Sequence, residues 1–234
     1  MKPKKYIILS ILAFFSNWVI GQNEIIIDAT SKDNIYEQVS KNKQYLLPDF
    51  SNGVVYFNDS QQAAGKLNYN VLIGEMHFIS PNNEILALDN VPNVRMITIG
   101  ERTFYHYKDK EFVETILVTD KMELQARRKS NLSAMGKKGA YGGYSSTSSI
   151  RTYSGLAGNS QIHDLSVSES MSLIPNDTYF LVLNGKRILI KNQQTFVKQF
   201  PNLKDKIEAF VKENDTHFDN EDNMIALVNY CSTL

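Results

Sequence analysis

Cysteine is almost absent from this sequence: Cys231 is the only one in 234 residues. A lone cysteine has no partner for a disulfide within the chain, so burial of apolar side chains must stabilise the fold. Its place in an apolar pattern near the C-terminus predicts a small buried residue on the last helix, with pairing between two chains as the alternative.

An excess of positive charge is also missing. The 25 lysine and arginine residues are balanced by 25 aspartate and glutamate residues. If Lys2, Lys4 and Lys5 are removed with a leader peptide, the remaining chain has a net charge of about −3. Such a chain has no general electrostatic attraction for phosphate backbones, which argues against a nucleic-acid partner.

The sequence lacks the spaced motifs of common enzymes and metal sites. His77, His106, His163 and His217 do not form an H-E-x-x-H motif or a Cys/His pair, so no metal site is predicted. There is no G-x-S-x-G motif for a nucleophilic serine, and the glycines of residues 136–143 do not match a phosphate-binding loop. We therefore expect no catalytic residue and no cofactor, and the chain is not predicted to be an enzyme.

The N-terminus is the most informative stretch that is present. Met1–Lys5 contains three lysines, Tyr6–Ile20 is mostly apolar, and Val19 and Gly21 lie at positions −3 and −1 of a cut before Gln22. This is the pattern of a signal peptide, and the apolar run is too short and interrupted to span a bilayer comfortably. We expect residues 1–21 to be removed, with a retained anchor as the alternative.

That prediction places the mature chain in the periplasm or at the cell surface. No second segment has the length and apolarity of a membrane span, so we expect no transmembrane segment in the mature chain.

Residues 22–135 are predicted to form a β-rich region. Short β-branched and aromatic runs separated by turn residues indicate an antiparallel meander. The expected strands are Val54–Phe57, Tyr69–Ile79, Ile85–Leu88, Val94–Ile99, Thr103–Tyr107 and Phe112–Val118. Residues 121–134 are ambiguous between strand and helix, because their apolar residues alternate with period two but most of the segment consists of good helix formers.

Residues 136–149 break this pattern with glycine, serine and lysine, which predicts a flexible loop or linker. Tyr141 and Tyr144 are its only large apolar side chains. We interpret them as candidate ligand- or partner-binding residues, because loops on a rigid scaffold often carry function. Packing of both rings over the sheet is the alternative.

Residues 150–234 are predicted to contain a hairpin and C-terminal helices, with a single domain formed together with residues 22–135 as the alternative to a separate one. Asn184 and Gly185 separate two apolar runs, which favours a type I′ turn and a hairpin over residues 178–190. The predicted fold class is therefore α+β: mainly an antiparallel β-sheet meander with a small C-terminal helical pair.

The helical pair follows from apolar residues at helical spacing. The first stripe, with Asn202 as its expected N-cap, consists of Leu203, Ile207, Phe210 and Val211. A last helix begins after Asp219 or Asn220, which can cap it. Helices of this length are marginal in water alone, so both should dock on the protein, with Phe210 and Val228 in the core.

Several segments give the chain a family resemblance. They read LNYNVLIGEMHFISPNNEILAL, VRMITIGERTFYH, GAYGGYSSTSS, FVKQFPNLKDKIEAFVKEN and FDNEDNMIALVNYC. Together they make the chain similar, over roughly residues 53–231, to a family of exported proteins of unknown function from Gram-negative bacteria. The resemblance implies a sheet-rich region, a polar loop, a hairpin, a helical tail and an envelope location. It implies no reaction and no catalytic residues.

These observations predict an exported soluble binding or structural protein of the bacterial envelope, with an envelope protein or a glycan as its partner. An exported hydrolase acting on glycan or peptide is one alternative, and it would need a pocket with convergent acids and bases. A small-ligand carrier is the other, and it would need an apolar cavity inside the sheet.

Overall fold

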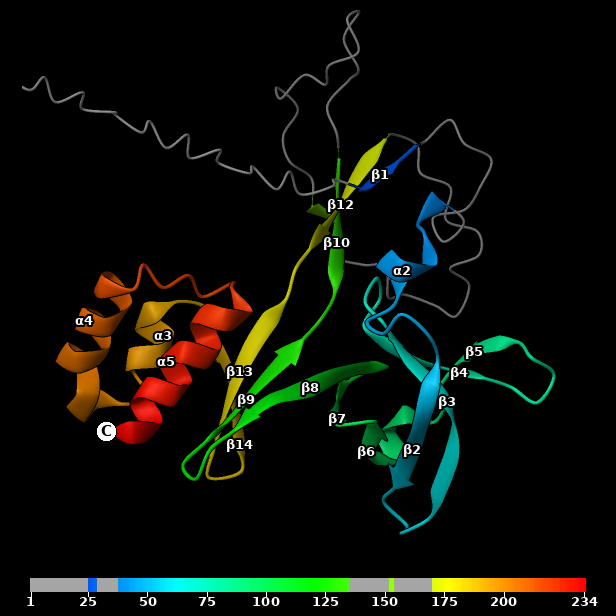
Figure 1. The fold of residues 1–234 in the computed structure, drawn as a ribbon, viewed down its shortest axis with the longest axis horizontal. Helices are drawn as coiled ribbons and strands as arrows, with labels where there is room; N and C mark the ends of the chain where they lie inside the picture. The colour runs from blue at the N-terminus through cyan, green and yellow to red at the C-terminus, as the bar shows by residue number, and fades with distance from the viewer. Residues whose placement is uncertain (1–24, 29–37, 135–151, 154–169) are drawn as a thin grey trace, which may run out of the picture.

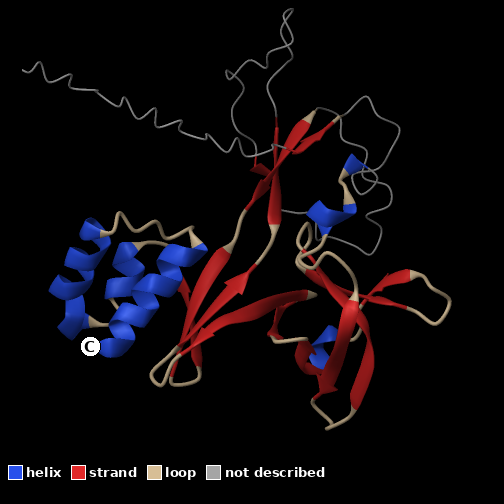
Figure 2. Ribbon diagram, viewed as in Figure 1, coloured by secondary structure: helices blue, strands red, loops and turns tan. Residues whose placement is uncertain are grey.

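The computed structural model describes residues 25–28, 38–134, 152–153 and 170–234. This part of the chain is mostly antiparallel β-sheet with a few small helices near the C-terminus, which confirms the predicted α+β class (Figures 1 and 2). The predicted loop at 136–149 with Tyr141 and Tyr144, and the predicted cleavage site before Gln22, lie outside the described residues.

Ten strands form the larger sheet, in the order β14-β13-β9-β8-β7-β6-β2-β3-β4-β5. Their bounds are β2 Ser51–Phe57, β3 Gln62–Asn70, β4 Glu75–Ile79, β5 Ile85–Ala87, β6 Val94–Ile99, β7 Arg102–Lys108, β8 Glu111–Val118, β9 Glu123–Arg127, β13 Thr178–Leu183 and β14 Lys186–Ile190. A short 3-10 helix, η1 (Val91–Asn93), precedes β6. Every neighbouring pair is antiparallel, as a meander requires.

Six of these strands close into a ring. β4 pairs with β8 through Glu75 and Glu111, which joins the two ends of the run β8-β7-β6-β2-β3-β4. The Phe112 N–H also donates to the Gly74 carbonyl at 3.2 Å. Inside the ring, Tyr69, Phe104 and Phe112 are at most 1% exposed, so large aromatic side chains fill this core.

A smaller sheet continues from the larger one. It has the order β1-β12-β10-β11, with β1 Ile25–Ile27, β10 Ser130–Ala134, β11 Thr152–Tyr153 and β12 Met171–Pro175. β10 follows β9 and β13 follows β12, and the Asn176 N–H donates to the Lys129 carbonyl at 2.7 Å between the two sheets. One antiparallel ribbon therefore runs from the larger sheet into the smaller one (Figure 1).

The C-terminal helices cover one face of the β9-β13-β14 end of the larger sheet (Figure 2). They are α3 Gln193–Val197, α4 Lys204–Glu213, preceded by the turn η3 Pro201–Leu203, and α5 Glu221–Thr233; a short helix α2, Lys41–Gln44, precedes β2. Phe196, Ile207, Leu227, Val228 and Cys231 are almost fully buried against the sheet. None of the helices in the described ranges is long and apolar enough to cross a membrane.

Several predicted elements are confirmed and others need correction. The hairpin at 178–190 and the helical pair are present, and residues 121–134 form strands β9 and β10 rather than a helix. The single strand expected over 69–79 is wrong, because the chain turns between Asn70 and Glu75, and β3 begins at Gln62. Asn202 lies in η3 and does not cap α4, whose N-cap Leu203 makes no side-chain bond.

Phe210 also differs from its predicted place in the core. Its side chain is only partly buried, and its ring stacks on Tyr230 with 4.5 Å between the ring centroids. Val228, by contrast, is 0% exposed.

Candidate functional site

The two faces of the β9-β13-β14 sheet differ in chemistry. Residues paired directly across neighbouring strands share a face. On the helix-covered face the pairs Leu124–Leu181 and Ala126–Tyr179 belong to the apolar core. The opposite face, which no described helix covers, carries the alternate residues Glu123, Gln125, Arg127, Thr178, Phe180, Val182, Arg187 and Leu189. We call this second surface the open face.

Cationic side chains surround one aromatic ring on the open face. Tyr107, from β7, packs its ring 5.1 Å from that of Phe180. The guanidinium carbons of Arg127 and Arg187 lie 5.9 and 5.8 Å from the centre of the Tyr107 ring, and the Lys108 ammonium lies 6.0 Å away. Such contacts are favourable because the face of an aromatic ring carries negative charge. We call these five residues the Tyr107 cluster.

Arg127 connects the cluster to buried charges beneath it. Its Nη1 donates to Glu111 at 3.2 Å and its Nη2 donates to the Thr178 hydroxyl at 3.1 Å. Lys129 donates to the other oxygen of Glu111 at 2.6 Å. Glu111 is therefore shared by two cations, while the buried Nε–H of Arg127 has no partner among the described residues.

Arg187 has a different environment. Its Nε donates to the side-chain oxygen of Gln125 at 2.7 Å, and Gln125 donates in turn to Thr115 and Glu123. Within the described ranges no carboxylate lies within salt-bridge distance of Arg187. Burial lowers the pKa of Arg187, and the nearby Tyr107 and Glu123 only partly oppose this.

On the helix-covered side, Arg128 joins three carboxylates from separate parts of the chain. It lies 2.6 Å from Glu114 of β8, 3.2 Å from Asp177 and 2.7 Å from Glu221 at the start of α5. Burial alone would lower the pKa of Arg128, but Glu221 and Glu114 raise it above its usual range. Arg102 also pairs with Glu114. This network holds α5 against the sheet, so its charged groups stabilise the fold.

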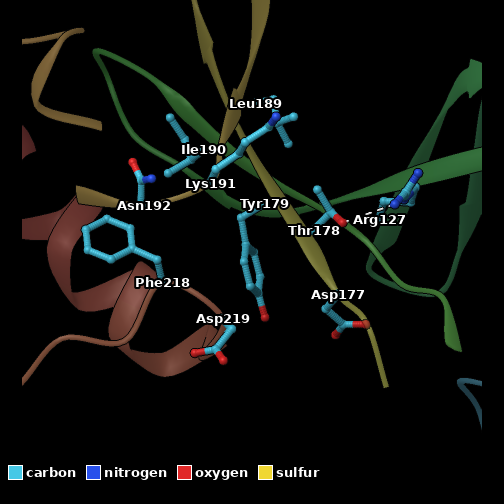
Figure 3. A pocket seen from close by; sticks show the side chains of 10 residues that line it. All are labelled: Arg127, Asp177, Thr178, Tyr179, Leu189, Ile190, Lys191, Asn192, Phe218 and Asp219. Carbon is cyan, nitrogen blue, oxygen red and sulfur yellow. Dashed lines mark hydrogen bonds between the residues drawn. The ribbon is translucent and has the colours of Figure 1, made fainter. Parts of the chain in front are cut away.

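A groove of about 540 Å³ lies at the edge of the sheet where β13 begins and β14 ends (Figure 3). In this view the Tyr179 hydroxyl points toward the end of the groove where Asp177 and Asp219 lie. Most polar groups of the groove already have structural partners: Asp177 pairs with Arg128, Thr178 accepts from Arg127, and Asn192 caps α3 by accepting from Thr195. Burial raises the pKa of Asp177, with Arg128 opposing and Glu221 adding to this effect.

The other titratable candidates lie apart from one another. His77 is buried and bonds with the Tyr45 hydroxyl at 3.0 Å, and burial lowers its pKa to about 4. His106 bonds to the Asp109 carbonyl, and His217 lies 3.5 Å from Asp215 on the surface. His163 falls outside the described residues.

Cys231 is a free, buried thiol, as expected from the sequence, and burial raises its pKa to about 11. Among the residues that the structure describes, no group of three or more histidine, cysteine, aspartate or glutamate side chains is arranged to hold a metal ion.

The Tyr107 cluster was not predicted from the sequence. Its signal was partly visible, since Glu123, Gln125 and Arg127 form the polar half of a strand alternation, but their partners come from distant strands. Comparisons with family models, with curated proteins and with solved structures found no match for this chain.

Proposed function

We propose that this chain is an exported binding protein of the bacterial envelope that holds its partner on the open face. The observation that carries the proposal is the asymmetry of the β9-β13-β14 sheet. One face is covered by α3, α4 and α5, whereas the other carries the partly exposed side chains of Tyr107, Arg127 and Arg187 and is covered by no helix of the described residues. Arginine and aromatic residues are enriched in protein interfaces.

Export itself rests on the sequence of residues 1–21. Fractionation of the producing cells should recover the chain outside the cytoplasm. N-terminal sequencing of the exported form should start at Gln22 or within a few residues of it. Recovery of a full-length cytosolic chain beginning at Met1 would contradict this part of the proposal.

Binding is tested with the mature chain and envelope fractions from cells that lack its gene. The fraction of protein retained by the envelope is compared for the wild type and for Val182→Asp, which places a carboxylate on the open face. Ala209→Asp is the matched control, because Ala209 is exposed on α4 and lies away from that face. We expect Val182→Asp to reduce retention and Ala209→Asp to leave it unchanged.

Equal retention of all three proteins would contradict a role for the open face. Thermal unfolding of each variant, followed by circular dichroism, shows whether any loss of retention reflects loss of fold.

A further inference from the structure

The Tyr107 cluster contains more positive than negative charge. Lys108, Arg127 and Arg187 all lie within 6.0 Å of one ring centre, and among the described residues only Arg127 of these three has a salt-bridge partner, Glu111. That carboxylate is already shared with Lys129. Arg187 has no carboxylate at salt-bridge distance in the described ranges, and the nearby Glu123 compensates its charge only in part.

Two donors in the cluster are incompletely used. The Arg127 Nε–H is buried without a partner in the described part of the chain, and a buried unsatisfied donor is unfavourable. The side chain of Arg187 is partly buried, donates through Nε to Gln125 and forms no salt bridge there, with Glu123 near enough only to oppose in part the effect of burial. Burying charge without compensation is unfavourable, so such groups commonly mark where an ion or ligand binds.

The chemistry of these side chains specifies the group that would satisfy them. A guanidinium presents a planar fork of N–H donors that matches carboxylate and phosphate oxygens, and an ammonium adds a point charge. Because the guanidinium carbons of Arg127 and Arg187 are both close to the same ring, they lie at most about 12 Å apart. This separation permits an oxyanion that lies beside the ring to contact more than one of the cations.

We propose that the Tyr107 cluster binds an oxyanion, a carboxylate or phosphate group carried by the ligand, through the side chains of Arg187 and Lys108, with the partly buried Arg127 adding positive charge beside them. This inference rests on the proposed function and names the chemistry of the ligand. A neutral ligand would leave the uncompensated cations as they are, so the anionic group is the part that the site recognises.

Isothermal titration of the mature protein at low ionic strength tests this inference with three probes. Inorganic phosphate and trigalacturonate supply the two oxyanions, and maltotriose is a neutral sugar of the same length as the second. We expect at least one anionic probe to bind, with an affinity that falls as salt is added, and maltotriose to give no heat. The probe that binds more tightly shows whether the ligand carries a phosphate or a carboxylate group, and either result supports the inference.

Variants locate the bound anion. Arg187→Gln should weaken binding at least tenfold, and Lys108→Gln should weaken it several-fold. Arg187→Lys should recover only part of the affinity, because it keeps the charge but loses the planar fork. Lys212→Gln, on the exposed side of α4, removes the same charge and should have no effect. Arg127 is left intact, because its replacement would also remove one of the two cations that pair with the buried Glu111.

Two results would overturn the inference. One is the absence of heat from both anionic probes, and the other is equal weakening by Arg187→Gln and Lys212→Gln, which would indicate only general attraction to surface charge. If Arg187→Gln fails to fold, Lys108→Gln decides alone, since Lys108 is exposed and has no structural ion pair in the described ranges. If the anion titrations fail while Val182→Asp still abolishes envelope retention, the oxyanion is wrong and the proposed function stands.

Discussion

The rings of Tyr107 and Phe180 lie 5.1 Å apart, although β8 and β9 separate their strands in the sheet. Neighbouring strands are about 4.8 Å apart, so in a flat sheet these two backbones would be separated by about 14 Å. The sheet must therefore curl toward the open face. This curl brings the ring of Tyr107 against that of Phe180, which is only 3% exposed, as is its cross-strand neighbour Gln125.

Phe180 should contribute to stability through this cross-sheet contact. Phe180→Ala is expected to lower the free energy of unfolding by about 3–5 kcal/mol, the usual cost of removing a buried phenylalanine side chain. Val182→Ala is the control, since Val182 lies on the same strand and face but is only partly buried, and it should cost less. Denaturant midpoints measure both, and equal effects would mean that the Tyr107–Phe180 contact adds nothing.

Removal of Arg128 should be among the most damaging single changes. Arg128→Gln leaves Glu114, whose side chain is 4% exposed, with Arg102 as its only ion-pair partner among the described residues. Breaking a buried ion pair on one side typically costs about 3–5 kcal/mol. The exposed pair Lys204–Glu208 on α4 provides the comparison, and Lys204→Gln should cost less than about 1 kcal/mol. Chemical denaturation of the two variants tests this, and similar midpoints would contradict it.

His77 should make stability depend on pH. Burial lowers its pKa from 6.5 to about 4, so the folded state binds fewer protons than the unfolded state between these values. The resulting stability is complete above pH 6.5 and is lost as the pH falls through 4, by an amount on the order of 3 kcal/mol. His77→Gln should remove this component, so the free-energy difference between wild type and variant should shrink from pH 7 to pH 4. A constant difference would show that His77 does not titrate as described.

The C-terminal helices should unfold together with the sheet. Leu227 of α5 is fully buried against β9 and β13, and Leu227→Ala is expected to cost about 2–5 kcal/mol. Phe210→Ala should cost less than Leu227→Ala, because Phe210 is only partly buried. The exposed Lys212→Ala should change stability by less than about 0.5 kcal/mol. An unchanged denaturant midpoint for Leu227→Ala would mean that the helices are a separate, weakly attached element.

Two glycines paired across β2 and β3 offer a matched test of packing. A methyl group on Gly53 would lie 2.6 Å from the Thr98 carbonyl oxygen and 2.7 Å from a Leu67 methyl carbon, whereas one on Gly65 meets nothing within 4 Å. Gly53→Ala should therefore destabilise by about 1–3 kcal/mol, as overpacking usually does. Gly65→Ala should be neutral or slightly stabilising. Thermal melting of both variants checks this, and a tolerated Gly53→Ala would contradict the close packing of β2 on β6.

Local chemistry made some elements predictable. Asn184 and Gly185 both have positive φ, as the type I′ turn requires, and the flanking apolar runs then pair as a hairpin. Asn220 accepts from the Asn223 N–H at the start of α5, where a cap was expected. In both cases the signal depends on a few neighbouring residues.

The turn between β3 and β4 shows why an apolar run alone was misleading. Leu72 and Ile73 are as buried as strand residues, but they lie in a turn and pack against the smaller sheet. Gly74, with φ of +78°, reverses the chain there. An apolar run indicates that a segment is buried, but it does not identify the segment as a strand. Here Leu72 and Ile73 are buried by the smaller sheet, which is distant in sequence.

The candidate site could not be predicted for a related reason. Tyr107, Arg127 and Arg187 come from three strands, and the chain leaves the larger sheet after Arg127 and returns only at Thr178. Strand order and the curl of the sheet decide which side chains meet. Neither can be inferred from the alternation of polar and apolar residues within one strand.

The topology of the larger sheet also bears on self-association. Unpaired edge strands invite pairing with another chain, and charged side chains are one means of discouraging it. β14 lies at one end of the strand order and pairs, among the described strands, only with β13; it opens with Lys186 and Arg187 and is followed by Lys191. The cations at that margin repel a second copy of the same margin, so replacing Lys186 and Lys191 with threonine should make the protein more prone to aggregate.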